Sequence, residues 1–254
     1  MVSSQSCPVL SNALPLPIFR RLASKRVVLA SSSPRRKDLL EAVGFKPEII
    51  PSTFAEDLPK SSFHGRLADY PIATAGEKAM EVYERLIKID DKNPADLVIS
   101  GDTVVIFPPE RDTVEGGVFH GEMSEIFEKP ISKVDQLRTL SLMAGRACEV
   151  VTGVTIVYPT VEAPGYKLES ISCSTIVHFG DNSLGSQKEL LEAYVESHQG
   201  IDRAGGFTIQ GVGGLLVERV EGSYDNAIGF PSSAFWRWMS ELDASGVFSE
   251  AWDA

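Results

Sequence analysis

The stretch LASSSPRRKDLL, residues 29–40, contains the signals that decide how the fold begins. Ser33 is a residue type preferred at a helix N-cap, and Pro34 suits the first helical position because its missing N–H is not needed there. Gly44 supplies the left-handed residue with which helices commonly end. The pattern therefore predicts a helix between Ser33 and Gly44, directly after a β-branched run at 26–30.

The first turn of this helix carries three cations, Arg35, Arg36 and Lys37. The unpaired N–H groups and the macrodipole of a helix N-terminus favour Asp or Glu there, each by roughly 0.3–1 kcal/mol, so the sequence breaks a local rule. Broken local rules are expected at functional sites. A bound anion would let the amides, the dipole and the guanidinium groups act together. We interpret the stretch as a phosphate or carboxylate site.

Composition narrows the class of ligand. The 254 residues are 43% hydrophobic and 23% charged, with a formal net charge of -11. This length allows one large domain or two small ones, and no apolar run is long enough to span a bilayer. This net charge argues against a general nucleic-acid binder, since such proteins usually have a net basic domain. Because residues 1–37 nevertheless hold seven Lys or Arg and no Asp or Glu, a small polyanion is the ligand that the charge pattern favours.

Targeting and metal motifs are few. Three cysteines without metal-ligand spacing indicate a reducing compartment, the cytoplasm, and four scattered histidines argue against a structural zinc site. Residues 1–26 are Ser-rich and free of acids, which weakly resembles an organelle-targeting segment. The interpretation that we favour is a disordered or loosely packed N-terminal extension.

Apolar periodicity indicates an α/β domain with a mixed sheet. Residues 48–71 look irregular, and the Gly-rich, acidic segment 108–127 is expected to be a long hairpin or loop insertion. The predicted strands cover 26–30, 96–107, 148–158, 167–179 and 215–220, and the further predicted helices cover 72–89, 132–145, about 186–197 and a last helix from 231.

Asp102 interrupts the apolar run ISGDTVVIF, residues 99–107. Because Asp is almost never fully buried unless it is paired, some group must satisfy its charge. In open α/β sheets ligands gather at the carboxyl ends of strands, and the preceding LVIS would deliver Asp102 and Thr103 to such an end. The alternative is an Asx-turn aspartate at a bend, without a functional role.

Three further features gain weight only in combination. The lysine of EKP at 128–130, the acidic pair at 56–57 and the Gly-rich segment 200–214 are each typical of solvated surface or of turns. Together with the cationic helix start and Asp102, they supply the parts of a metal-dependent phosphate-ester or phosphoanhydride hydrolase. No Walker loop, GxGxxG fingerprint or GxSxG elbow follows a strand, which disfavours P-loop, Rossmann and serine-hydrolase chemistry.

These residues lie in motifs that resemble the Maf nucleotide pyrophosphatases, a family once described as septum-formation inhibitors. The resemblance runs in order through LASSSPRRKDLLEAVG (29–44), GEKA (76–79), ISGDTVV (99–105), EKP (128–130), VVTGV (150–154) and IDRAGGFTIQGVGGLLVERVEGSYDNAIGFP (201–231). It implies one elongated α/β domain over 27–254, with a central mixed β-sheet flanked by helices and a deep cleft, similar to inosine triphosphate pyrophosphatases. It also implies a homodimer that hydrolyses a nucleoside triphosphate to the monophosphate and pyrophosphate with Mg2+ or Mn2+.

The resemblance further assigns roles to individual residues. Asp102 would accept the proton of the attacking water, with Lys129 and Glu56 as further catalytic residues, and Glu56 and Asp102 would hold the metal. Which role of Asp102 dominates stays open, because one carboxylate cannot easily be both a tight metal ligand and a free base. The implied substrate contacts are Ser33, Arg35, Arg36, Lys78, Thr103 and Gln210, of which Arg35, Thr103 and Gln210 match positions used for substrate choice.

The motifs GDTVV, EKP and TIQG resemble the subfamily that acts on dTTP and UTP more than the one that acts on 7-methylguanosine triphosphate. The chain departs from the family pattern at Arg203, where lysine is usual, at Cys148, where histidine is common, and in the longer insertion at 108–127. Two alternatives stay open. They are a non-catalytic nucleotide-binding regulator of cell division and a pyrophosphatase for purine or methylated guanine nucleotides.

Overall fold

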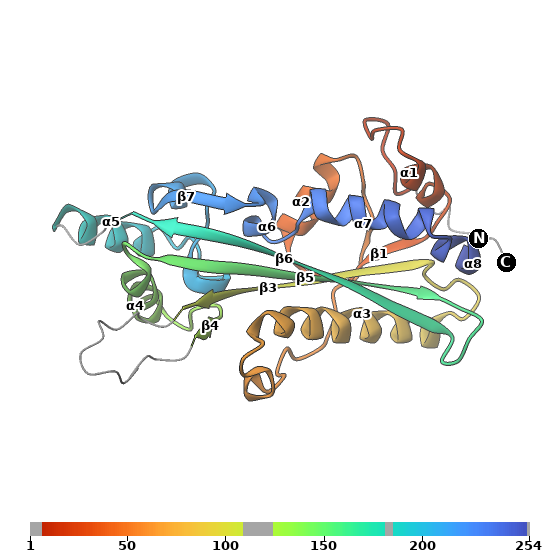
Figure 1. Cartoon of the computed structure of the whole chain (residues 1–254), viewed down its shortest axis with the longest axis horizontal. Coiled ribbons are helices and arrows are strands. Elements are labelled where there is room, and N and C mark those ends of the chain that lie inside the picture. Colours follow the sequence, from red (N-terminus) through yellow and green to blue (C-terminus); the bar gives the residue numbers. More distant parts are fainter. Residues whose placement is uncertain (1–6, 109–123, 181–184, 253–254) are drawn as a thin grey trace.

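A seven-stranded mixed sheet forms the centre of the computed structural model, which describes residues 7–108, 124–180 and 185–252 (Figure 1). The strands are β1 (Val27–Leu29), β2 (Glu48–Ile49), β3 (Leu97–Phe107), β4 (Glu125–Phe127), β5 (Ala147–Pro159), β6 (Tyr166–Phe179) and β7 (Val217–Gly222). Their order is β2-β1-β3-β5-β6-β7, with β4 paired to β3. β1 is parallel to β2 and β3, and the other pairs are antiparallel. The predicted mixed α/β sheet is confirmed.

Helices cover both faces of this sheet. They are α1 (Pro17–Leu22), α2 (Pro34–Ala42), α3 (Tyr70–Ile89), α4 (Lys133–Met143), α5 (Gly185–Glu196), α6 (Tyr224–Ile228), α7 (Ser232–Ala244) and α8 (Val247–Trp252), with 3-10 turns η1 (Lys60–Phe63), η2 (Leu67–Asp69), η3 (Ala204–Gly206) and η4 (Gly211–Leu215). Figure 1 shows α3 along one face, α2, α6 and α7 along the other, and α4 and α5 at one end. The domain is elongated along β5 and β6, as the resemblance implies. None of the described helices combines the length and the apolar character that a membrane crossing needs.

Most predicted elements are present, with boundaries shifted by a few residues. The stretch LASSSPRRKDLL leads into α2, with Ser33 as the N-cap at φ -69° and ψ 114° and with Gly44 beyond the C-terminus at φ +84°. The Ser33 side chain makes no capping hydrogen bond. Helices α3, α4, α5 and α7 match predicted helices, whereas α1, α6 and α8 lack a predicted counterpart.

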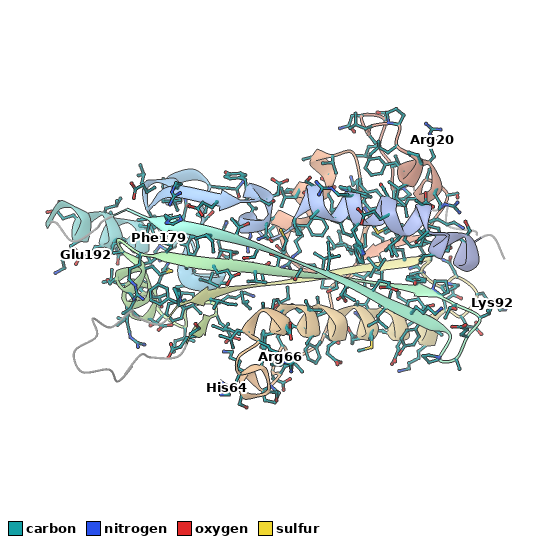
Figure 2. The ribbon with its side chains drawn as sticks, in the orientation of Figure 1. Arg20, His64, Arg66, Lys92, Phe179 and Glu192 are labelled. Carbon is teal, nitrogen blue, oxygen red and sulfur yellow. The ribbon has the colours of Figure 1, made fainter. Side chains whose placement is uncertain are left out.

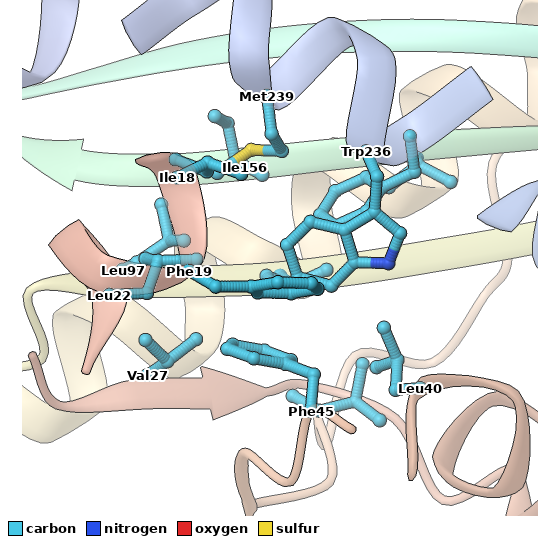
Figure 3. Packing of buried hydrophobic residues seen from close by; sticks show 14 of the residues in the cluster. Ile18, Phe19, Leu22, Val27, Leu40, Phe45, Leu97, Ile156, Trp236 and Met239 are labelled. Carbon is cyan, nitrogen blue, oxygen red and sulfur yellow. The ribbon is translucent and has the colours of Figure 1, made fainter. Parts of the chain in front are cut away.

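The α1 segment belongs to the core, which corrects the expectation of a loosely packed extension for residues 7–26. Ile18 is fully buried and Phe19 is 4% exposed. The Phe19 ring centroid lies 4.4 Å from that of Trp236 on α7, and the Phe45 centroid lies 5.0 Å from it (Figure 3). Burial of large aromatic side chains offsets the entropy of ordering one short helix, and composition alone does not reveal that contact.

β3 runs unbroken through the polar SGDT, which corrects the expectation that Asp102 stands at the end of this strand. Asp102 is paired with Gly153 of β5 in the middle of an antiparallel ladder. Because β5 satisfies the backbone along this stretch, a charged side chain does not end the strand. Side chains alternate across a strand, so Asp102 faces α3 together with Val104, while Thr103 faces α2.

One edge of β3 is open at its centre. β1 pairs with β3 only over 97–99 and β4 only over 105–107, so residues 100–104 have no strand partner on that edge within the described ranges. The carboxyl end of the parallel strand β1 meets this gap, and such ends are where α/β sheets gather ligands. The strand end at this gap is therefore that of β1, and the expectation that β3 ends there is wrong.

The insertion expected at 108–127 leaves the sheet from β3 and returns as β4. Val105 is paired with Phe127, and Phe107 with Glu125, in the antiparallel register that the two arms of a hairpin require. Residues 109–123 of this insertion lie outside the described residues.

Gly153 lets the N-terminus of α3 approach the sheet. A Cβ atom at this position would lie 2.5 Å from the backbone of Pro71 and of Ile72, which is closer than packed carbon and nitrogen atoms approach. We predict that Gly153→Ala displaces α3 from β5 and lowers the free energy of unfolding by about 1–3 kcal/mol, the range for an overpacked core. Equilibrium denaturation in urea measures the change.

Gly76 in α3 provides the matched control. A Cβ atom there meets only Leu168 Cδ2, at 4.0 Å, and alanine is favoured over glycine inside a helix by roughly 0.5–1 kcal/mol. Gly76→Ala should therefore leave the free energy of unfolding unchanged or raise it. Equal destabilisation by both variants would contradict the packing role of Gly153.

Candidate functional site

A cleft of about 500 Å³ surrounds the open edge of β3. Its volume lies in the range of about 300–1,000 Å³ that small-molecule sites occupy. In a chain of net charge -11, the cleft carries a slight excess of positive charge, as an anion site requires. The charged residues that line it are Arg35, Arg36, Lys78, Lys129 and Arg203, with Glu56, Asp102, Glu128 and Asp202.

Arg36 is the buried cation of one wall and is 9% exposed. Its Nε donates to Gly229 O at 2.9 Å, Nη1 to Ser31 Oγ at 3.1 Å and Nη2 to Thr103 Oγ1 at 3.0 Å. Gly101 makes room for the guanidinium, since a Cβ atom there would lie 3.1 Å from Nε. Burial lowers the pKa of Arg36, but a guanidinium stays charged at neutral pH. The side chain therefore ties α2 to β3 and to the end of α6, and it presents a fixed charge to the cleft.

Lys78 joins two carboxylates on the opposite face of β3. Its Nζ lies 2.8 Å from Asp102 Oδ1 and 2.8 Å from Glu56 Oε1. Lys78 is 6% exposed and Asp102 is 9% exposed, whereas the Glu56 side chain is 47% exposed. Removing one partner of such a pair leaves an uncompensated buried charge, which is strongly destabilising. The structure thus brings together three site residues that lie in three separate segments of the sequence.

Glu56 has a backbone conformation that glutamate rarely adopts, with φ +56°. Burial raises the pKa of its carboxyl, but the hydrogen bond and charge of Lys78, together with the charge of Lys129, lower the pKa by more. The net pKa lies below the ordinary value, so Glu56 is an anion at neutral pH. Strained backbone of this kind clusters at functional sites.

The Gly-rich segment 200–208 closes the cleft against α2. Asp202 Oδ2 lies 3.2 Å from Arg35 Nη1, and Arg203 Nη1 donates to Thr208 Oγ1 at 2.8 Å. Arg203, the departure from the usual lysine, therefore uses one guanidinium N–H within its own segment. The segment turns at three glycines with positive φ, Gly200, Gly205 and Gly206.

The remaining predicted site residues divide into two groups. Ser33 and Lys129 line the cleft, and Lys129 is exposed there. Gln210 is exposed at the N-cap of η4 and is not among the residues that line the cleft. Its contact with a substrate stays a prediction.

Sequence reasoning misses several residues of the cleft. Ser31 and Asp202 stand in the motifs SSSPRR and IDRAGG, so their positions carried a usable signal. Gly229 stands in the motif at 201–231, whereas Tyr70 has no local pattern, because it reaches the cleft only after α3 has packed on the sheet. Burial, with the neighbouring carboxylates, raises the pKa of Tyr70, so its phenol stays protonated.

Among the residues that the structure describes, neither a cysteine nor a histidine lines this cleft. Cys148 is 1% exposed, and burial raises its pKa to about 12, so its thiol stays protonated. Figure 2 shows His64 and Arg66 on the segment before α3, at the outer margin of the molecule. Within the described ranges, no three His, Cys, Asp or Glu side chains come together as a metal cluster.

The donor set nevertheless fits a hard cation that also binds phosphate. Glu56 and Asp102 bring carboxylate oxygens to one point of the cleft, since both reach the same ammonium group. Mg2+ is commonly held by one or two carboxylates together with substrate phosphates, rather than by a complete protein cage. Two carboxylates beside a collection of cations are suited to such a site.

We predict that Glu56 stabilises the fold except at acid pH. Its pKa in the folded protein lies below the ordinary value of 4.5, so its contribution is present above pH 4.5 and is lost as the pH falls through the lower, folded pKa. The difference in unfolding free energy between the wild type and Glu56→Gln, measured in urea, should shrink below pH 4.5. A difference that does not change with pH would contradict the ion pair with Lys78.

Comparison with known proteins agrees with the motifs and the cleft. The profile of the family described as Maf-like protein matches residues 26–242. The chain is 36% identical to the dTTP/UTP pyrophosphatase of Schizosaccharomyces pombe over 234 residues, which cover 90% of this chain and 88% of that protein. It is 32% identical to the dTTP/UTP pyrophosphatase of Saccharomyces cerevisiae over 252 residues, which cover 95% of this chain and 97% of that protein.

A human relative is longer. The chain is 40% identical over 230 residues to the probable bifunctional dTTP/UTP pyrophosphatase/methyltransferase protein of Homo sapiens, and the match covers 89% of this chain but 33% of that protein. The shared part is therefore one region of the human protein and nearly the whole of the two yeast proteins. Since the family profile covers most of the sequence and these identities exceed 30%, the chain belongs to the Maf family.

Proposed function

We propose that this protein hydrolyses dTTP and UTP to the nucleoside monophosphate and pyrophosphate. The observation that carries the proposal is the contact of Lys78 with Asp102 and Glu56 in a cleft that also collects guanidinium groups. Relatives that match this chain over nearly their whole length are dTTP/UTP pyrophosphatases. The cleft is also large enough for a small-molecule ligand.

Charge neutralisation is the first task of such a site. Water must approach a polyanion, so the protein has to offset the phosphate charge and orient the attack. Arg35 is suited to this task because its side chain is 20% exposed and is held by Asp202, a contact that a phosphate can replace. Ser33 and Lys129 lie on the same cleft, and Arg36 adds a fixed charge beside them.

The apolar part of the cleft is suited to the nucleoside. Buried and partly buried apolar side chains from β3, β5, α6 and the end of η3 line it, and Thr103 and Thr208 add hydroxyl groups. Thr103 already binds Arg36, so substrate choice and phosphate binding are linked through one contact. The apolar side chains meant here are Val105, Val150, Phe207, Ala227 and Ile228.

Asp102 is the base that we assign to the attacking water. Its carboxylate lines the cleft at the open edge of β3, and Lys78 holds Oδ1 at 2.8 Å. A carboxylate fixed in this way keeps its orientation while it accepts a proton. Glu56 on the same ammonium keeps a second negative charge near the reacting group.

Glu56 would also hold Mg2+ or Mn2+, and Asp102 would join it as a ligand only in so far as it is not the base, since one carboxylate cannot easily serve in both roles. When bound, such an ion neutralises phosphate charge and polarises the oxygen that leaves. Lys78 offsets the repulsion between the two carboxylates, so the pair is assembled in the protein alone. We further propose a homodimer in the cytoplasm, which the family resemblance supports and with which the free thiols of all three cysteines are compatible.

A pure binding role is less well supported by the geometry. A site that only bound a triphosphate would gain nothing from two carboxylates facing it, because they repel phosphate. A pyrophosphatase for purine or methylated guanine nucleotides would use the same charged groups and differ at the apolar end of the cleft. The assay below separates both alternatives from the leading proposal.

We predict that Asp102→Asn lowers the rate of pyrophosphate release from dTTP and UTP with Mg2+ by about 100-fold or more, the usual effect of removing a general base. A coupled assay for pyrophosphate measures the rate, and a thermal melt of the variant verifies that it is folded. Asp91→Asn, at an exposed position outside the cleft, is the matched control and should leave the rate unchanged.

The proposal is decided by the products of this assay and by the rates measured with a panel of natural and modified nucleoside triphosphates. Release of orthophosphate instead of pyrophosphate would reject the proposed bond. Saturable binding without turnover would favour the regulator, and faster turnover of inosine or 7-methylguanosine triphosphate would favour the purine alternative. Full activity of Asp102→Asn would reject the assigned base.

A further inference from the structure

Glu81, one turn after Lys78 on α3, binds the segment that carries Glu56. Ser52 Oγ donates to Glu81 Oε2 at 2.8 Å, and Thr53 N donates to the same oxygen at 3.0 Å. Thr53 Oγ1 donates to Glu81 Oε1 at 3.0 Å. One carboxylate therefore accepts three hydrogen bonds from two consecutive residues, three and four positions before Glu56.

Arg85 completes this contact. Its Nε lies 2.8 Å from Glu81 Oε1, and its Nη2 donates to Pro51 O at 2.8 Å. Burial raises the pKa of Glu81, but the hydrogen bonds from Thr53 and Ser52 and the charge of Arg85 lower it by more. Glu81 is thus a charged acceptor at neutral pH. We refer to Glu81 and Arg85, with the backbone and hydroxyl groups that they bind at 51–53, as the loop clamp.

The segment after the loop clamp has little regular structure of its own. Residues 51–59 form neither helix nor strand, and Glu56 lies in the left-handed region at φ +56°. The direct contacts of Glu56 are the ion pair with Lys78 at 2.8 Å and a hydrogen bond from Tyr70 Oη to its carbonyl at 3.4 Å. A strained residue persists only where its surroundings over-determine its conformation. The loop clamp supplies the anchor on the N-terminal side.

We propose that Glu81 is a positioning residue of the hydrolase, which holds the loop so that the Glu56 carboxylate stays beside Asp102. The inference rests on the proposed function, in which Glu56 acts at the reacting phosphates. Lys78 and Glu81 are three residues apart and share one face of α3, so one helix holds both the carboxylate of Glu56 and the backbone before it. Glu81 does not line the cleft and therefore acts through Glu56.

The first test is the variant Glu81→Gln, which keeps the shape of the side chain but removes its charge and one acceptor oxygen. We expect kcat for dTTP with Mg2+ to fall by about 10- to 100-fold, the cost of displacing a catalytic group by roughly 1 Å, with a smaller change in KM. Glu84→Gln is the matched control on the same helix. Glu84 binds Lys88 and Tyr166 and makes no hydrogen bond to the segment 51–59. The kcat of Glu84→Gln should therefore be unchanged.

A double-mutant cycle shows whether Glu81 acts through Glu56. In the Glu56→Gln background, Glu81→Gln should cause no further fall in kcat, because the group that it positions has gone. If Glu81→Gln lowers kcat by the same factor in the Glu56→Gln background as in the wild type, the inference is wrong. Full activity of Glu56→Gln alone would overturn the inference and the role of Glu56 in the proposed function together.

Hydrogen exchange gives a readout that does not depend on activity. The Thr53 amide donates to Glu81, so its exchange should be faster in Glu81→Gln and unchanged in Glu84→Gln. Thr53→Val removes only the Oγ1 donor and should lower kcat in the same direction, even if Glu81→Gln folds poorly. Unchanged exchange at 51–57 in Glu81→Gln and unchanged kcat in Thr53→Val would overturn the inference. If Asp102→Asn and Glu56→Gln still lower kcat, the proposed function stands without it.

Discussion

The site depends on the ion pair between Lys78 and Asp102, whose atoms lie 2.8 Å apart across one face of β3. A carboxylate in the centre of a sheet persists only if another group offsets the loss of its hydration. Lys78 reaches it because Gly153 lets α3 lie directly on β5. The same ammonium also pairs with Glu56. The group that compensates the buried charge of Asp102 therefore also holds the second carboxylate in the cleft.

The open edge of β3 explains how an acidic protein can build an anion site. Asp102 and Thr103 are consecutive and so face opposite sides of the sheet, yet both line the same cleft because no strand covers residues 100–104 within the described ranges. Arg36 is fixed on the side of Thr103, and Lys78 on the side of Asp102. Cations therefore surround the gap from both faces, although the net charge of the chain is -11.

The errors of the sequence interpretation share one cause, which is long-range pairing. Asp102 was expected at a strand end because its charge interrupts an apolar run, but β5 provides a continuous ladder that does not depend on the side chain. The α1 segment has an unremarkable composition, and only contact with Trp236 on α7 shows that Phe19 is buried.

The local elements and the residue types of the site follow from the amino-acid sequence. Helix caps, apolar periods and ordered motifs depend on neighbouring residues, so they predict α2, the mixed sheet and the charged groups from Arg35 to Lys129. Which of these groups meet depends on long-range packing. The contact of Lys78 with both carboxylates, the hydrogen bonds of Arg36 to Thr103 and Gly229, and the contact of Glu81 with the loop each join distant segments. Such contacts are set by how α2 and α3 pack on the sheet, and no local sequence pattern encodes that packing.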